Sequence, residues 1–144
     1  MRLVVGQIER AAMLYARVAL GTAFLSAVAG RFGIWDRTLD WAHFERFIRR
    51  TAEVNAFMPA FTIPFLAWAA TAAEISFGVA LIAGVQLRWV ALGSAVLLGL
   101  FALAMTASLG VKPPLDYSVF SASAGALLLG LRAWSPASKN SRSA

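Results

Sequence analysis

Four long apolar stretches dominate this sequence and limit the folds that it can adopt. They cover residues 11–29, 61–84, 89–109 and 115–134. Each has roughly the 20 apolar residues that a helix needs to cross the hydrocarbon core of a bilayer. Of all residues, 60% are hydrophobic and 14% are charged, whereas soluble domains carry about 25% charged residues. The sequence therefore predicts an all-α polytopic membrane protein, folded as a four-transmembrane-helix bundle.

Short connections divide the later stretches and set the expected topology. A turn at residues 84–88 joins the second and third stretches, and the sequence GVKPP at 110–114 breaks the chain before the fourth. Residues 1–134 are expected to form a single membrane domain, followed by a flexible polar tail at 135–144. An even number of spans places both termini on one side. The basic residues near span ends favour cytoplasmic termini in the inner membrane.

The long connection between the first and second stretches predicts an amphipathic helix. Between residues 40 and 55, apolar side chains recur at helical spacing, and Asp40 is a suitable N-cap. Charged residues occupy the opposite face, so the helix is expected at the membrane interface. It is either a lid over the mouth of the bundle or a docking surface for a soluble partner. The apolar positions are Trp41, Phe44, Ile48 and Ala52.

Two charged residues lie well inside the first two apolar stretches, Arg17 in the first and Glu74 in the second. A charge in hydrocarbon is costly, so such residues usually face a partner and are candidate functional residues. Counted from the shared membrane face, their Cα atoms are expected roughly 6 Å apart in depth, at about 1.5 Å per residue. We therefore predict a buried Arg17–Glu74 pair. It either fixes helix packing or lines a polar pocket that holds a ligand headgroup or relays a proton.

Small and hydroxyl-bearing side chains are expected around this pair. Small residues at four-residue spacing let membrane helices approach closely, which is an alternative explanation for most of them. Asp116 is also explained as a charge at a helix N-terminus. The candidates for the pocket lining are Gly21, Thr71, Gly78, Ser118 and Ser121, and those for its entrance are Asp116 and Tyr117.

Several classes of chemistry are excluded by composition. The chain has no cysteine and one histidine, His43, so it cannot form a disulfide, a thiolate site or a multi-histidine metal site by itself. The phosphate loops and nucleophile elbows of soluble enzymes are absent from the sequence. The net charge is +6, but the basic residues cluster at the ends of apolar stretches. Anionic lipid headgroups are therefore the expected partner, and nucleic acid is not.

Three groups of residues follow one another in a characteristic order. The groups are Arg17, Gly21, Phe24 and Gly30-Arg31-Phe32; then Ala73-Glu74, Gly78, Leu81, Gly84 and Arg88; then residues 110–121. This arrangement resembles the DoxX family of small integral membrane proteins over roughly residues 12–131. The resemblance implies a four-helix membrane bundle with the arginine and the glutamate in the same places.

The resemblance also implies a redox role. Some DoxX-family members are subunits of a thiosulfate:quinone oxidoreductase, and others associate with soluble redox or oxidative-stress enzymes. A related group acts in thiol redox maturation through cysteines, which this chain lacks.

The leading hypothesis is a membrane subunit of a redox system, as part of a quinone-linked oxidoreductase, with a quinone near Arg17 and Glu74. No cofactor site is visible in the sequence, so the electrons would come from a soluble or membrane redox partner. The alternative is a non-catalytic membrane adaptor or assembly factor for soluble redox or stress-response enzymes. A small transporter, which would need to assemble as an oligomer, is a third hypothesis.

Overall fold

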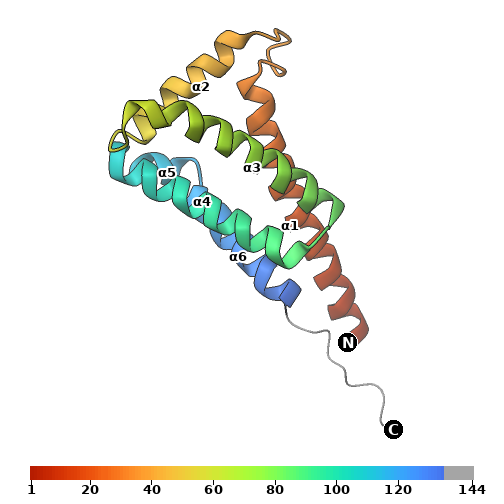
Figure 1. Ribbon diagram of the computed structural model, residues 1–144. Coiled ribbons are helices and arrows are strands. Elements are labelled where there is room, and N and C mark those ends of the chain that lie inside the picture. The colour runs from red at the N-terminus through yellow and green to blue at the C-terminus, as the bar shows by residue number, and fades with distance from the viewer. Residues whose placement is uncertain (135–144) are drawn as a thin grey trace.

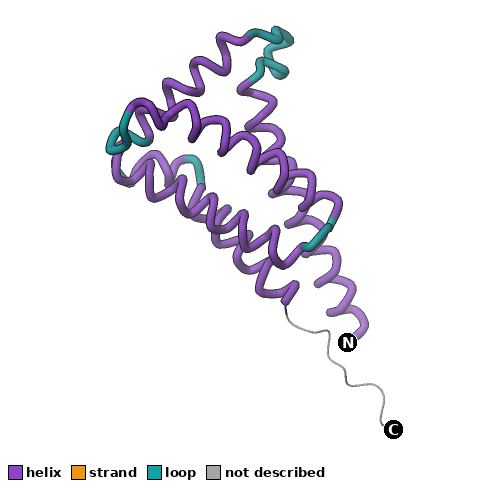
Figure 2. Tube along the Cα trace, in the orientation of Figure 1, coloured by secondary structure: helices purple, strands orange, loops and turns teal. Residues whose placement is uncertain are grey.

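The computed structural model describes residues 1–134, which are almost entirely helical (Figure 1, Figure 2). This part of the chain contains no β-strand, which confirms the all-α prediction. The predicted flexible tail at 135–144 lies outside the described residues. In chain order the elements are α1 (Arg2–Arg31), α2 (Trp41–Val54), the 3₁₀ helix η1 (Ala60–Thr62), α3 (Ile63–Ala83), α4 (Leu87–Leu109), α5 (Lys112–Asp116) and α6 (Val119–Trp134).

Within residues 1–134, three segments are long and apolar enough to cross a membrane. They are Val4–Arg31, Ala60–Ala83 and Leu87–Leu109, and they correspond to the first three predicted spans. The remaining apolar helix, Val119–Trp134, has 16 residues and is about 24 Å long, shorter than a hydrocarbon core of about 30 Å. Three spanning helices therefore agree with the prediction, whereas helix length alone does not establish a fourth crossing.

Two local features move the start of the last helix from the predicted residue 115 to Val119. Pro113 and Pro114 lie in the first turn of the short helix α5, where a missing N–H is tolerated best. Ser118 then has a left-handed φ of 55°, which residues with a side chain rarely adopt. The apolar stretch is therefore divided between α5, a turn and α6.

α1 extends beyond the predicted span, because it begins at Arg2 and not at residue 11. Its 30 residues make a helix about 45 Å long, which exceeds the thickness of the hydrocarbon core. In the extra turns, Glu9 forms an ion pair with Arg132 of α6. Close by, the rings of Trp89 and Trp134 meet edge to face, with centroids 5.2 Å apart. The start of α1, the start of α4 and the end of α6 therefore lie at one end of the bundle (Figure 1).

The long helices pack as two close pairs, α1 with α3 and α4 with α6. In the first pair, a Cβ added to Gly21 would lie 2.8 Å from the backbone oxygen of Gly78. In the second, a Cβ added to Gly130 would lie 2.9 Å from the side chain of Leu92. Small residues at these points allow the backbones to approach closely. The residues that join the two pairs in one core are Phe24, Leu81, Ala91 and Leu129.

α2 lies across the end of the bundle opposite the start of α1, and it confirms the predicted amphipathic helix (Figure 1). The carboxylate of Asp40 accepts a hydrogen bond from the N–H of Ala42 at 3.1 Å. Phe44 is completely buried. Its ring stacks on Phe32, with centroids 5.4 Å apart, and lies 4.4 Å from the ring of Trp68. Aromatic contacts therefore attach α2 to the end of α1 and to α3.

Candidate functional site

A large cavity, partly open to the surroundings, lies between the helix pairs and beneath α2. Its volume is about 1470 Å³, larger than the roughly 300–1,000 Å³ of most small-molecule sites. The walls are mainly apolar and come from α1, α3, α4 and the first turn of α6. The polar side chains come mostly from α2 and the residues around it. The polar residues in the wall are Arg31, Asp36, His43, Arg46, Arg50, Thr51, Asn55, Glu74 and Tyr117.

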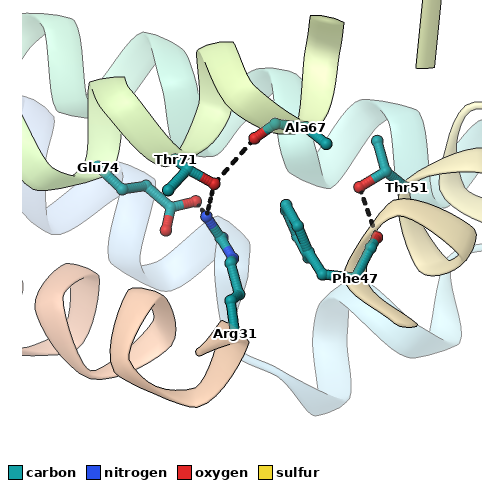
Figure 3. Close-up of polar contacts among 6 residues, drawn as sticks. All are labelled: Arg31, Phe47, Thr51, Ala67, Thr71 and Glu74. Atoms are coloured by element: carbon teal, nitrogen blue, oxygen red, sulfur yellow. Dashed lines mark hydrogen bonds and ion pairs between the residues drawn. The ribbon is translucent and has the colours of Figure 1, made fainter. Parts of the chain in front are cut away.

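Arg31 and Glu74 form a buried ion pair in this wall (Figure 3). Nη2 of Arg31 donates to Oε1 of Glu74 at 2.6 Å, and the two side chains are 11% and 2% exposed. Nη1 of Arg31 donates to Oγ1 of Thr71 at 2.9 Å, and that hydroxyl donates in turn to the Ala67 carbonyl at 2.8 Å. Thr71 and Glu74 share a face of α3 because they are three positions apart. Arg31, the last residue of α1, reaches both.

α2 covers this cluster with an aromatic ring. The guanidinium carbon of Arg31 lies 3.8 Å from the centroid of the Phe47 ring, which is a cation–π contact. One turn later, the hydroxyl of Thr51 donates to the Phe47 carbonyl at 2.8 Å (Figure 3). The position of α2 is therefore coupled to the buried ion pair, and the ring limits the access of water to it.

One oxygen of the buried carboxylate has no partner among the described residues. Within residues 1–134, Oε2 of Glu74 is buried and accepts no hydrogen bond. Leaving a buried polar atom unpaired costs about 1–3 kcal/mol, and more when the group is charged. The same residue lines the cavity. A water molecule or a ligand in the cavity can therefore supply the missing donor.

A second polar pair lies at the α2 end of the cavity. Nε2 of His43 is 3.0 Å from Oδ2 of Asp36, and the two side chains are 13% and 69% exposed. Nδ1 of His43 is buried and has no partner in the described residues. The ring packs on Gly33, which has a φ of 71° and where an added Cβ would lie 3.0 Å from the imidazole. This pair links the cavity wall to the exposed surface.

The predicted Arg17–Glu74 pair is not formed, because the two residues lie at different depths. The contact between Gly21 and Gly78 sets the antiparallel register, so Arg17 is level with Ile82. Glu74 is eight residues away from that level, or roughly 12 Å along the helix at about 1.5 Å per residue. The predicted separation was half as large, because the depth of each residue was counted from the expected ends of the two spans and not from the contact between the helices. Arg31 is nearer, since six residues separate it from the level of Glu74.

Arg17 instead caps the C-terminal end of α3. Its Nε donates to the Leu81 carbonyl at 3.0 Å, and its Nη2 donates to the Ile82 carbonyl at 2.9 Å. The last carbonyls of a helix lack helical partners and carry partial negative charge. Gly84 makes room for the guanidinium, because a Cβ there would lie 2.6 Å from Nη2. Arg17 is therefore a structural residue outside the cavity wall.

Three other predicted pocket residues lie beside the cavity and not in its lining. Gly21 and Gly78 form the contact between α1 and α3. Thr71 is buried on α3, where it holds Arg31 in place. Their contribution to the site is to position the arginine and the glutamate.

Of the predicted site residues near the start of the last helix, one lines the cavity and the others lie on the exposed surface. Tyr117 lines the cavity. Ser118 and Ser121 are exposed, and the left-handed turn at Ser118 separates the two serines from the helical face that they were expected to share. Asp116 forms an exposed ion pair with Lys112. Of these four residues, the structure brings one into the cavity.

Sequence reasoning missed Arg31, Phe47 and the His43–Asp36 pair. Arg31 directly follows an apolar stretch, so it resembled an ordinary basic residue at a membrane boundary. One signal could have identified it. Gly21 and Gly78 are both glycines inside the apolar helices. An antiparallel register that pairs them places Glu74 six residues from the level of Arg31 and eight residues from the level of Arg17.

Residues 9–116 match the family model described as methylamine utilisation protein MauE. The resemblance to the DoxX family was therefore wrong. Glycines spaced along apolar helices reflect close helix packing in membranes generally, and they do not separate one such family from another. No curated protein and no solved structure matches the chain significantly.

Proposed function

Because the chain belongs to the family of methylamine utilisation protein MauE, we propose that it is a membrane subunit of a redox system linked to methylamine utilisation. Methylamine holds its carbon in a reduced state, so its use as a nutrient releases electrons that need an acceptor. A lipid-soluble quinone is an acceptor that an integral membrane protein can reach. The proposed ligand of the cavity is therefore a quinone, and a soluble or membrane redox partner supplies the electrons.

One observation carries the quinone proposal: a buried polar cluster borders a large apolar cavity within a membrane protein. The volume of about 1470 Å³ suits a ring that carries a long hydrocarbon tail. Leu66, Leu97 and Phe101 are among the apolar residues of the walls, and they match such a tail. At the polar end, Arg31 has N–H groups that can donate to a ring oxygen. Oε2 of Glu74 is free to accept a hydrogen bond.

Each residue of the cluster has a defined role in this proposal. A bound quinone would supply two-electron chemistry, and the chain would supply its binding and orientation. Arg31, held by Thr71 and Phe47, orients the ring. Glu74 would accept a hydrogen bond at Oε2 when the ring carries a hydroxyl group. The His43–Asp36 pair offers a route from the cavity wall to the exposed surface.

Quinone retention tests this function. The protein, purified in a mild detergent, is expected to release a quinone on extraction with organic solvent, as measured by liquid chromatography. The double variant Arg31→Met with Glu74→Gln removes both charges of the buried pair. It is expected to retain about tenfold less, the equivalent of about 1.4 kcal/mol of binding free energy.

The matched control is Glu9→Gln, which removes a carboxylate at the other end of the bundle and is expected to retain quinone as the wild type does. A wild-type protein that carries no more quinone than an unrelated membrane protein purified in parallel would contradict the proposal. The non-catalytic adaptor or assembly factor would then be favoured, because α2 presents Glu45 and Arg49 on an exposed face.

The proposal includes a topology of four crossings, with both termini in the cytoplasm. The chain has no cysteine, so each introduced cysteine is unique. A membrane-impermeant maleimide is expected to label Arg49→Cys, on α2, in intact cells. Gln86→Cys, in the turn after α3, and a cysteine at position 139 should be labelled only after permeabilisation. Labelling of position 139 from the same side as position 49 would show that α6 does not cross.

A further inference from the structure

The buried polar atoms without partners in the cavity wall are hydrogen-bond acceptors. Oε2 of Glu74 is one, because the carboxylate that forms the ion pair with Arg31 has no hydrogen of its own and only accepts. Nδ1 of His43 is the other. In the neutral tautomer whose Nε2 hydrogen is directed at Asp36, 3.0 Å away, Nδ1 keeps its lone pair and accepts. Within residues 1–134, both unpaired atoms therefore need a hydrogen-bond donor as a partner, and a ligand in the cavity could supply one.

A hydroxyl group matches this wall better than a carbonyl group does. A hydroxyl oxygen accepts from one neighbour and donates to another, so it can lie between an N–H of Arg31 and Oε2 of Glu74. A carbonyl oxygen has no hydrogen to donate. It would place its lone pairs against the carboxylate and leave Oε2 unpaired, at the cost that buried unpaired groups carry.

We infer that the cavity binds the reduced carrier, a hydroquinone, in preference to the oxidised quinone. This preference rests on the proposed function, because it assumes that a quinone enters the cavity. The preference also changes the midpoint potential of the bound quinone/hydroquinone couple. A protein that binds the reduced form tenfold tighter raises the midpoint potential of the bound two-electron couple by about 30 mV. The bound quinone then becomes a stronger electron acceptor than the quinone free in the membrane.

Anaerobic binding measurements test this inference on the full chain in lipid nanodiscs. The probes are a benzoquinone with one isoprenoid unit, its hydroquinone, and the 1,4-dimethyl ether of that hydroquinone. We expect the wild type to bind the hydroquinone about tenfold more tightly than the quinone, equal to about 1.4 kcal/mol. The dimethyl ether has a similar shape but no donor, so it should bind no better than the quinone.

Glu74→Gln sharpens the test, because an amide can present a donor where the carboxylate presents only an acceptor. This variant should bind the quinone at least as tightly as the hydroquinone. Glu9→Gln, outside the cavity, should keep the wild-type preference. Equal binding of quinone and hydroquinone by the wild type, or tighter binding of the ether, would overturn the inference and leave the proposed function intact. Failure of all three probes to bind would contradict the proposed function itself.

Discussion

Replacing Arg31 with methionine is expected to lower the free energy of unfolding by about 3–5 kcal/mol, the cost of breaking a buried ion pair on one side. Oε1 of Glu74 would lose its contact with Arg31, and the side chain is 2% exposed. A carboxylate buried to this extent has little access to bulk water that could replace the lost partner. Thermal unfolding in detergent, followed by circular dichroism, measures the effect as a fall in the unfolding temperature.

Two further variants separate this pair from the other arginine of α1. Arg31→Met combined with Glu74→Gln should recover most of the lost stability, because neither charge then remains buried alone. Arg17→Met removes one partly buried and one exposed hydrogen bond to α3 carbonyls. It should cost less, because the partly buried bond contributes about 1.5–3 kcal/mol and water can replace the exposed one. The ion pair would be disproved as a stabilising unit if the losses at Arg31 and Glu74 were additive.

Gly21→Val is expected to cost about 3 kcal/mol, at the upper end of the range for overpacked interiors. A Cβ at this position would lie 2.6 Å from the side chain of Ile82 and 2.8 Å from the backbone oxygen of Gly78. The side chain can move, but the backbone of α3 can yield only if the two helices separate. Separation would also pull Arg31 away from Glu74. We therefore expect lower thermal stability together with loss of quinone retention.

The matched control is Gly125→Val on α6, since an added Cβ there meets no atom within 4 Å. This change should leave stability nearly unchanged, because valine is a somewhat better helix former than glycine. Equal losses from the two substitutions would indicate a general intolerance of larger residues. In that case the Gly21–Gly78 contact would not be what holds the first helix pair together.

Local patterns in the sequence predicted the helices well. Asp40 as an N-cap and the spacing of Trp41 and Phe44 depend on neighbours within one or two turns. The structure places α2 and its buried Phe44 accordingly. The apolar stretches likewise define α3 and α4 within a few residues, because length and composition determine which segments suit a membrane.

The contacts between helices could not be predicted in the same way. The partner of Glu74 depends on the depth at which α1 and α3 meet, and that depth is set by one close approach between Gly21 and Gly78. An error of a few residues in this depth was enough to assign Arg17, and not Arg31, as the partner of Glu74. The left-handed φ of Ser118 also follows no strong local signal, since serine rarely adopts it. Residues that only three-dimensional packing brings together, such as Phe47 and Arg31, were therefore missed.

Two arginines of α1 bind to a helix that is synthesised later, so the contacts between α1 and α3 depend on the order of synthesis. Arg17 and Arg31 both find their partners on α3, which are 64 and 43 residues later in the chain. At about 5–20 residues per second, the ribosome needs roughly 3–13 s to travel from Arg17 to its acceptors. Until then the Leu81 and Ile82 carbonyls that accept from Arg17 do not exist. The hydrogen bonds and the ion pair between α1 and α3 therefore form only after α3 has been made, although α1 is the first helix synthesised.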